Sequence, residues 1–203
     1  GRGAGIVTHA EMRPVLQAAG CDLGTDFGVE VAGRRTLDRA GRLIGERACP
    51  QIMTSWDRLF RMLRARFPAD LYHLGRELLR VEARPDGVTA HFSDGSRIDG
   101  DLIVGADGFR STVRGAVLPE VRPAYAGYVG WRGLVEEMVL SAKTHADIFD
   151  AMVFGLPPNE QFINYPIAGA DDDISPGRRR ANFVWYRPVA DSELAPMLTD
   201  GAG

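Results

Sequence analysis

The stretch "DLIVGADGFRSTVR", Asp101 to Arg114, says most about the fold. Its continuous apolar run, Leu102 to Val104, predicts a strand buried on both faces, because a half-exposed strand alternates apolar and polar residues. Two glycines follow, and Ser111 or Thr112 can then cap a helix. In a strand, glycine turn and helix start, main-chain amides and the positive helix end can meet a phosphate. A tight strand-to-helix connection needs the same glycines, so the pattern leaves both interpretations open.

Among the Asp-Gly pairs upstream are Asp86-Gly87 and Asp94-Gly95. Each stands between segments that alternate apolar and polar residues, which is typical of a hairpin turn. The segment 77–108 is therefore predicted to contain a three-stranded antiparallel meander.

Two helices are predicted nearer the N-terminus. In "TSWDRLFRMLRARFP" apolar residues recur at three-and-four spacing, Thr54 and Asp57 form a capping pattern, and Pro68 follows. In "THAEMRPVLQAAG" Thr8 and Glu11 are spaced as a capping box, but Pro14 indicates a kink or a later start.

Strands are predicted for much of the remaining sequence. Between the helices, residues 27–47 alternate and are broken by glycines, which predicts two or three strands. After Arg114 the chain is strand-like and aromatic, in "YAGYVGWRGLV", "AMVFGL", "QFINYPIAG" and "RANFVWYRPV". This half is predicted to be mainly β.

The first residues, "GRGAGIV", have glycines spaced G-x-G-x-G, which is not the G-x-G-x-x-G dinucleotide fingerprint. They predict either a flexible loop or one whose backbone lies against a flat ligand.

Charge and composition exclude several classes of function. With 24 basic and 27 acidic residues the net charge is −3, and "RRR" at 178–180 is too short for a nucleic-acid surface. No apolar segment is long enough to cross a membrane, so we expect no membrane partner. Cys21 and Cys49 have neither metal nor redox spacing and indicate a cytoplasmic protein. No metal site is predicted.

Several of these segments together resemble the flavin-dependent aromatic hydroxylases. "DLIVGADGFRSTVR" is similar to the family's Asp-Gly motif, "GAGIV" to its loop beside the flavin ring, and "SWDRLFRML" to its next helix. "YAGYVGWRGLV" resembles the strand that opens the substrate domain. "INYPIAG" and "SPGRRRANFVWYRPVA" look most like the 2,6-dihydroxypyridine hydroxylase-like members. The resemblance covers nearly the whole chain.

The resemblance implies an α/β (α+β) fold in two parts. Residues 1–118 would be the remainder of an FAD-binding Rossmann-like domain without its first βαβ unit. Residues 119–203 would be the first part of a mainly antiparallel β substrate domain. The family's G-x-G-x-x-G and second Gly-Asp motifs do not occur in this sequence, so we expect a central portion of a longer enzyme.

The resemblance also implies a cofactor site. Main-chain groups of Gly5 and Ile6 would bond the edge of the isoalloxazine ring. The Asp-Gly motif would serve FAD and, less directly, the co-substrate NAD(P)H; its residues here are Gly105, Ala106, Asp107, Gly108, Ser111 and Arg114. Trp56 stands where many members have a polar residue, and core packing is an equal interpretation of it.

The implied activity is hydroxylation of an electron-rich aromatic or N-heteroaromatic ring with NAD(P)H and O2. The substrate would be a small phenol-like or hydroxypyridine-like molecule, and a homodimer is left open. Aromatic and polar residues on the later strands could form the substrate wall, or simply belong to the core: Trp131, Asn164, Tyr165 and Trp185. No catalytic base is identified, because the four histidines are isolated.

Two alternatives remain. One is a reductase or halogenase with the same cofactor fold. The other is a non-catalytic fragment or binding module of a flavoprotein.

Overall fold

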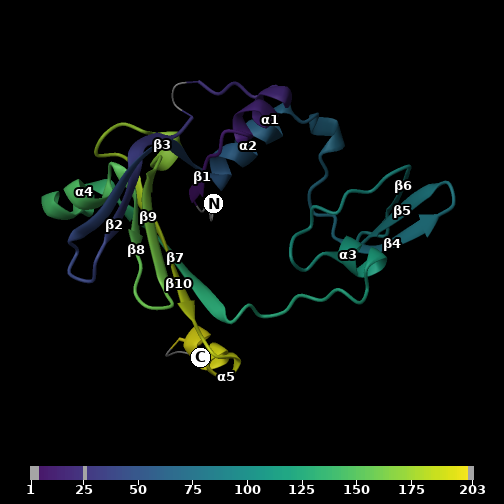
Figure 1. Cartoon of the computed structure of the whole chain (residues 1–203). Helices are drawn as coiled ribbons and strands as arrows, with labels where there is room; N and C mark the ends of the chain where they lie inside the picture. The colour runs from purple at the N-terminus through teal and green to yellow at the C-terminus, as the bar shows by residue number, and fades with distance from the viewer. Residues whose placement is uncertain (1–4, 25–26, 201–203) are drawn as a thin grey trace. The chain divides into compact units, whose positions relative to one another are not determined.

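The structure, a computed structural model, describes residues 5–24 and 27–200 (Figure 1). The chain forms two compact units. Residues up to Phe67 and from Gly127 onward form the first unit, and Pro68–Ala126 form the second. The predicted domain boundary after residue 118 stays a prediction, and each unit is described by itself below.

The first unit is built on a seven-stranded mixed sheet in the order β1-β3-β2-β8-β9-β10-β7. Only β2 and β8 pair in parallel among the described strands. The strands are β1 Gly5–Val7, β2 Val29–Leu37, β3 Leu43–Ser55, β7 Tyr128–Glu136, β8 Ala151–Gly155, β9 Gln161–Ile167 and β10 Arg180–Pro188. The predicted mainly antiparallel β half is confirmed, and residues 27–47 supply two strands of a hairpin turned at Gly41.

The first unit also contains the helices that accompany this sheet. They are α1 Met12–Ala18, α2 Trp56–Arg66, α4 Ala142–Ile148 and α5 Asp191–Leu198, with 3-10 turns η2 Glu137–Val139 and η3 Ala170–Asp172. Helix α2 is confirmed, but its cap is one residue later than predicted. The Ser55 hydroxyl accepts from the Arg58 amide, because the Thr54 hydroxyl donates to the Phe27 carbonyl instead.

Helix α1 starts later than its capping pattern predicted. The Thr8 hydroxyl donates to the Ile52 carbonyl, and Glu11 precedes the helix without a side-chain cap. Pro14 is then the third helical residue, where its missing N–H costs nothing because first-turn amides have no helical partner. The predicted capping box was therefore wrong, and the later start was right.

Two apolar cores lie on opposite sides of β1 and β3. One packs α1 against α2 through Leu16, Phe27 and Leu59, and Ile6 adds to it. The other joins β2, β3, β8 and β9 through Val31, Met53, Met152, Tyr165 and Ile167, and Val7 adds to it. Trp56 belongs to neither core: it is 61% exposed, so its interpretation as core packing was wrong.

The second unit is the predicted meander with a short helix. Its elements are η1 Ala69–Leu71, β4 Leu78–Arg84, β5 Gly87–Phe92, β6 Arg97–Gly100 and α3 Thr112–Val117. The strands pair antiparallel in the order β4-β5-β6, and Asp86-Gly87 and Asp94-Gly95 lie at their turns.

The buried strand predicted at Leu102–Val104 was wrong. These residues have no regular structure, and the side chains of Leu102 and Val104 are 79% and 77% exposed. A strand needs a hydrogen-bonding neighbour. No strand among the described residues pairs with this run, so its apolar character alone does not make it a strand.

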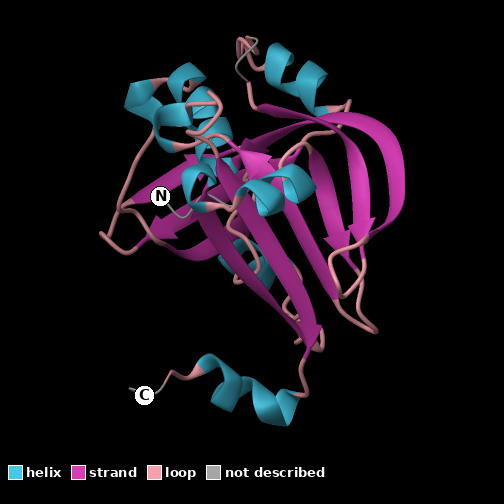
Figure 2. Ribbon diagram, turned by 90° about the vertical axis from the view of Figure 1, so that its left-hand side faces the viewer, coloured by secondary structure: helices cyan, strands magenta, loops and turns pink. Residues whose placement is uncertain are grey.

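The sheet of the first unit curls strongly (Figure 2). The Gly5 amide on β1 donates to Asn182 Oδ1 on β10, although β3, β2, β8 and β9 lie between these strands in the sheet. The face of β7, β9 and β10 that β1 approaches is called the inner face below, and the opposite one the outer face.

Candidate functional site

The inner face carries a row of three paired residues, Leu134 on β7, Asn182 on β10 and Tyr165 on β9. Alternation along a strand places them on one face, because residues two apart point the same way. Asn182 is 2% and Tyr165 5% exposed, whereas Leu134 is 43% exposed. The row is therefore covered at Tyr165 and Asn182 and open at Leu134.

Gly5 provides the cover. A side chain there would lie 2.6 Å from the Tyr165 ring and 2.9 Å from Asn182, so only glycine fits this close approach. The Gly5 amide donates to Asn182 Oδ1 at 3.1 Å, which fixes the orientation of the Asn182 amide group. Its other end, Nδ2, is buried and makes no hydrogen bond of good geometry with the described residues.

Burial raises the pKa of Tyr165, and nearby Arg132 and the Asn182 amide oppose this rise without cancelling it. The phenol is therefore protonated at neutral pH and can donate a hydrogen bond. Arg132 lies on the inner face next to Leu134, since it pairs with Val184, which pairs with Ile163. It is exposed and makes no ion pair or hydrogen bond within the described part of the chain.

A cavity of about 470 Å³ borders this row. Leu134, Ile167 and Arg180 line it from the sheet, and Ser55, Asp57 and Arg61 line it from the start of α2. Turn η3 closes another side through Asp171 and Asp172, both in the left-handed backbone region. The cavity is large enough for a small ring compound.

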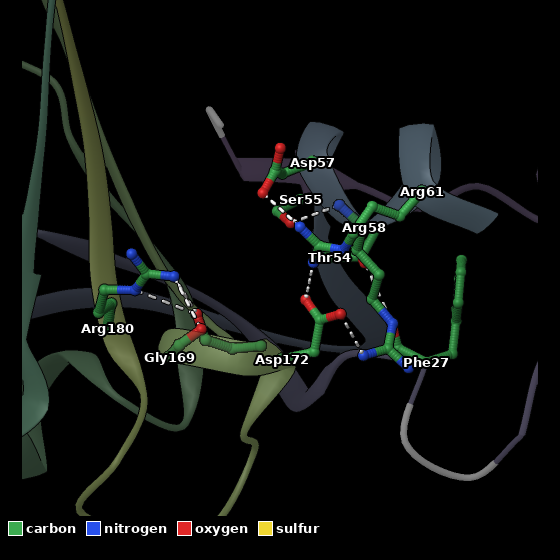
Figure 3. A network of polar contacts seen from close by, with 10 residues as sticks. Phe27, Thr54, Ser55, Asp57, Arg58, Arg61, Gly169, Asp172 and Arg180 are labelled. Carbon is green, nitrogen blue, oxygen red and sulfur yellow. Dashed lines mark hydrogen bonds and ion pairs between the residues drawn. The ribbon is translucent and has the colours of Figure 1, made fainter. Parts of the chain in front are cut away.

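Ion pairs hold that turn against α2 (Figure 3). Asp172 accepts from Arg61 at 2.7 Å and pairs with Arg58 at 3.3 Å. Arg180 donates to the carbonyls of Ala168 and Gly169, so its charge faces main-chain oxygens (Figure 3). The wall of the cavity is thus fixed by contacts between residues far apart in sequence.

A wider hollow of about 790 Å³ lies where β1 leads into α1, lined among others by His9, Glu30, Cys49 and Gln51. The Gln51 amide donates to the Thr8 carbonyl there. None of its lining residues belongs to the row of Leu134, Asn182 and Tyr165.

The four residues of the predicted substrate wall do not form one surface. Trp131 pairs with Trp185, and Asn164 pairs with Phe183 on the same, outer face. Tyr165 alone points to the inner face. The outer residues already have partners: Trp185 Nε1 donates to Glu160 at 2.7 Å, and Asn164 Nδ2 donates to the Ile148 carbonyl.

In the second unit, the Asp107 carboxylate caps helix α3. It accepts from the Ser111 hydroxyl and from the amides of Thr112 at 2.7 Å and Val113 at 3.2 Å. The Ser111 hydroxyl in turn accepts from the Arg114 amide. The hydrogen bond from Ser111, with those from the amides, holds the pKa of Asp107 below its usual value. Ser111 is the N-cap residue of α3, and it was one of the two residues, Ser111 or Thr112, predicted for that position.

Three amides at this helix start donate within the loop, and the predicted role of the motif at the cofactor stays a prediction. Arg114 donates to the Phe109 carbonyl. Gly105 lets α3 approach, since a side chain there would lie 2.7 Å from Val113. Gly108, in the left-handed region at φ +75°, faces open space within 4 Å. Gly105, Ala106 and Gly108 lie in a segment without regular secondary structure, and their predicted contact with FAD stays a prediction.

Sequence patterns missed a buried carboxylate, Glu137, which is 5% exposed. Arg179 binds it through both Nε and Nη2, His145 lies 2.7 Å away, and the amides of Gly177 and Arg179 donate to it. Despite opposing burial, these donors lower the pKa of Glu137 to about 2. The Glu137 carboxylate links η2 to the start of β10. Both of its oxygens accept hydrogen bonds from these donors, so the carboxylate has a structural role.

In the described residues, no group of three or more His, Cys, Asp or Glu side chains is placed to hold a metal ion. The helices that the structure describes include none long and apolar enough to span a membrane.

Comparison with known proteins agrees with the motifs. A family model described as FAD binding domain-like matches residues 125–203, which include β7 to β10. The 2,6-dihydroxypyridine 3-monooxygenase of Paenarthrobacter nicotinovorans is 31% identical over 100% of this chain and 50% of its own length. The 3-amino-4-hydroxybenzoate 2-monooxygenase of Streptomyces cremeus is 38% identical over 70% of this chain and 34% of its own.

A solved structure agrees as well. The 2,6-dihydroxypyridine-3-hydroxylase from Arthrobacter nicotinovorans superimposes with a TM-score of 0.88 at 30% identity, covering 100% of this chain and 51% of that one. The predicted α/β fold is confirmed by this match. The chain spans about half the length of the first relative. It is a homologue of the flavin-dependent aromatic hydroxylases, as its motifs predicted.

Proposed function

We propose that this chain is part of an FAD-dependent monooxygenase that hydroxylates an electron-rich aromatic or N-heteroaromatic ring. One oxygen atom of O2 enters the ring, the other leaves as water, and NAD(P)H supplies two electrons. The observation that carries the proposal is the match over the whole chain to a dihydroxypyridine hydroxylase in both sequence and structure.

The residues present fit FAD at two places. β1 is an end strand of the described sheet, so one of its edges carries main-chain groups that no described strand pairs, at the predicted residues Gly5 and Ile6. The Gly5 amide is taken by Asn182, which leaves other groups of that edge for the ring. The second place is the main chain around Gly108, where nothing lies within 4 Å of the missing side chain. FAD would supply the oxygen-transfer chemistry.

The chain's own residues would bind and orient the ring. Leu134 lines the cavity and lies in the same cross-strand row as Tyr165, the one predicted substrate residue on the inner face. The protonated phenol of Tyr165 would donate to an oxygen on the ring, and Gly5 and Asn182 would hold it in place. Asp107, Ser111 and Arg114 would act indirectly, by fixing the loop that presents Gly105 to Gly108.

Location and assembly belong to the same proposal. Cys21 and Cys49 are free thiols, which supports a reducing, cytoplasmic compartment. The substrate would be a small aromatic molecule. A homodimer stays a prediction that analytical ultracentrifugation would check.

The proposal is tested by NAD(P)H oxidation with FAD present. Hydroxypyridines and phenols are expected to stimulate oxidation, whereas the same rings with methylated hydroxyls are not. Stimulation without a hydroxylated product would point to a reductase, and a halogenated product in the presence of halide would point to a halogenase. No stimulation by any ring would favour a non-catalytic binding module.

A further inference from the structure

The open part of the inner face has a cation, Arg132, that forms no ion pair with any described residue. Arg132 stands between Leu134 and Gly130 on β7, and all three point to this face. The Tyr186 ring lies over Gly130, where a side chain would be 3.4 Å from its Cε1. Arg132 is therefore flanked by an apolar side chain and an aromatic ring.

Among the residues that the structure describes, no carboxylate forms an ion pair with Arg132. On this face of β7 the next acidic residue is Glu136, four residues along and about 13 Å away by strand geometry. Within the described residues, 5–24 and 27–200, no group forms an ion pair or a hydrogen bond with the Arg132 side chain. By contrast, Arg58, Arg61 and Arg179 on the same unit each meet a carboxylate. An arginine left free beside apolar and aromatic surface is placed to meet a ligand rather than a side chain.

The surroundings specify the ligand. Leu134 and the Tyr186 ring, which contacts Tyr128 edge-on at 5.8 Å between centroids, offer apolar surface to a planar ring. One row away, about 7 Å along the strand, Tyr165 provides a phenol that can donate. A planar guanidinium binds anionic oxygens with paired hydrogen bonds. Arg132 and Tyr165 can both donate, and Arg132 carries a positive charge, so the matching substituent is an acceptor with negative charge.

We propose that Arg132 is the specificity-determining residue of this site, binding an anionic oxygen substituent of the ring, either an ionised hydroxyl or a carboxylate. This inference rests on the proposed function, which identifies the ligand as an aromatic ring. It adds that the ring carries a negative charge and that Arg132 recognises this charge. Tyr165, held by Asn182 and Gly5, orients the ring from the neighbouring row.

The test is a binding measurement, which does not depend on turnover. Calorimetry with FAD in excess would compare 2,6-dihydroxypyridine at a pH where a hydroxyl is ionised, benzoate, and neutral 2,6-dimethoxypyridine. Arg132→Met is expected to weaken binding of at least one anionic ring ten-fold or more and to leave the neutral ring unchanged. A loss confined to 2,6-dihydroxypyridine identifies the ionised hydroxyl, and one confined to benzoate identifies the carboxylate.

Two further variants keep the test sharp. Arg132→Lys retains the charge without the paired donors and is expected to lose less than Arg132→Met. Arg187→Met removes an arginine of β10 that points to the outer face and is expected to leave all three affinities unchanged. Because Arg132 is exposed and forms no hydrogen bond or ion pair with the described residues, its variants should unfold at the wild-type urea concentration.

Equal weakening of all three rings by Arg132→Met, no weakening of any, or no binding of either anion by the wild type would overturn the proposal. If anions bind through Arg132 but no ring is hydroxylated, the binding site stands and the proposed monooxygenase function fails.

Discussion

The Asp107 loop and the junction of Gly5 with Asn182 each contain residues that were predicted to bind FAD. The two regions are held together by different kinds of contact. In the loop, each hydrogen bond of Asp107 joins residues four to six positions apart. At the junction, one hydrogen bond joins residues 177 positions apart. The loop is shaped by its own sequence, whereas the junction exists only once the sheet has curled.

This difference explains what each region can do. The Asp107 carboxylate and three amides of the loop form hydrogen bonds within the loop. The groups left for a ligand are therefore mainly main-chain groups at its glycines. The junction buries Tyr165 and Asn182 beside an open, positively charged surface and a cavity. This difference supports our proposal that the junction side recognises the ring and that main-chain groups position the cofactor.

The largest effect is expected from another long-range junction, Glu137. Its pKa lies near 2 against an ordinary 4.5, so Glu137→Gln should lower the free energy of unfolding at pH 7 by about 3 kcal/mol. A carboxyl group whose pKa is lowered by folding stabilises the folded state at pH values above its pKa in the unfolded chain. This stabilisation is lost as the pH falls from about 4.5 toward 2. Urea unfolding should show the gap between wild type and variant narrowing from pH 7 to pH 3.

Glu136→Gln is the matched control, because Glu136 is the exposed neighbour and should change little at either pH. A gap for Glu137→Gln that is the same at pH 7 and pH 3 would contradict the assignment of the stabilisation to its ionised carboxylate.

A smaller effect is expected at Gly5. Gly5→Ala places a methyl group 2.6 Å from the buried Tyr165 ring and should cost about 2 kcal/mol, as overpacking commonly does. Gly115→Ala is the control, because Gly115 in α3 has open space and a helical alanine is favoured over glycine. If thermal unfolding showed both variants equally stable, the close approach of β1 to β9 would be wrong.

The smallest of these effects concerns the loop. Asp107→Ala removes the acceptor for two amides and should lower hydrogen-exchange protection of Thr112 and Val113 roughly five- to ten-fold, as loss of a helix cap does. Asp101→Ala, an exposed acid at the start of the same stretch, should leave that protection unchanged. Unaltered exchange in Asp107→Ala would mean that the cap does not order the helix.

The same contrast separates what could be read from the sequence. Helix α2, the meander and its Asp-Gly turns were predicted, because spacing and turn residues act over a few positions. The cap of α2 was misplaced by one residue, since Thr54 and Ser55 are both competent and a distant carbonyl takes Thr54. The strand predicted at Leu102–Val104 was wrong because the residues of a segment do not show whether another strand will pair with it.

The site was predictable only in part. Tyr165 stays a predicted substrate residue, and the sequence did not show that it faces away from Trp131, Asn164 and Trp185, since that depends on register. Asn182, Arg132 and Glu137 were missed. One signal was available for Asn182: a single amide within the apolar run "ANFVW" of a predicted strand indicates a buried polar contact.

The most direct measurement for the account as a whole is the fate of molecular oxygen. The protein with FAD, NAD(P)H and 2,6-dihydroxypyridine or a related hydroxylated ring is incubated under ¹⁸O2, and the product is analysed by mass spectrometry. We predict a hydroxylated ring carrying one ¹⁸O atom, formed in proportion to the NAD(P)H consumed. A ring that is unchanged, or an oxygen that comes from water, would contradict the proposed monooxygenase.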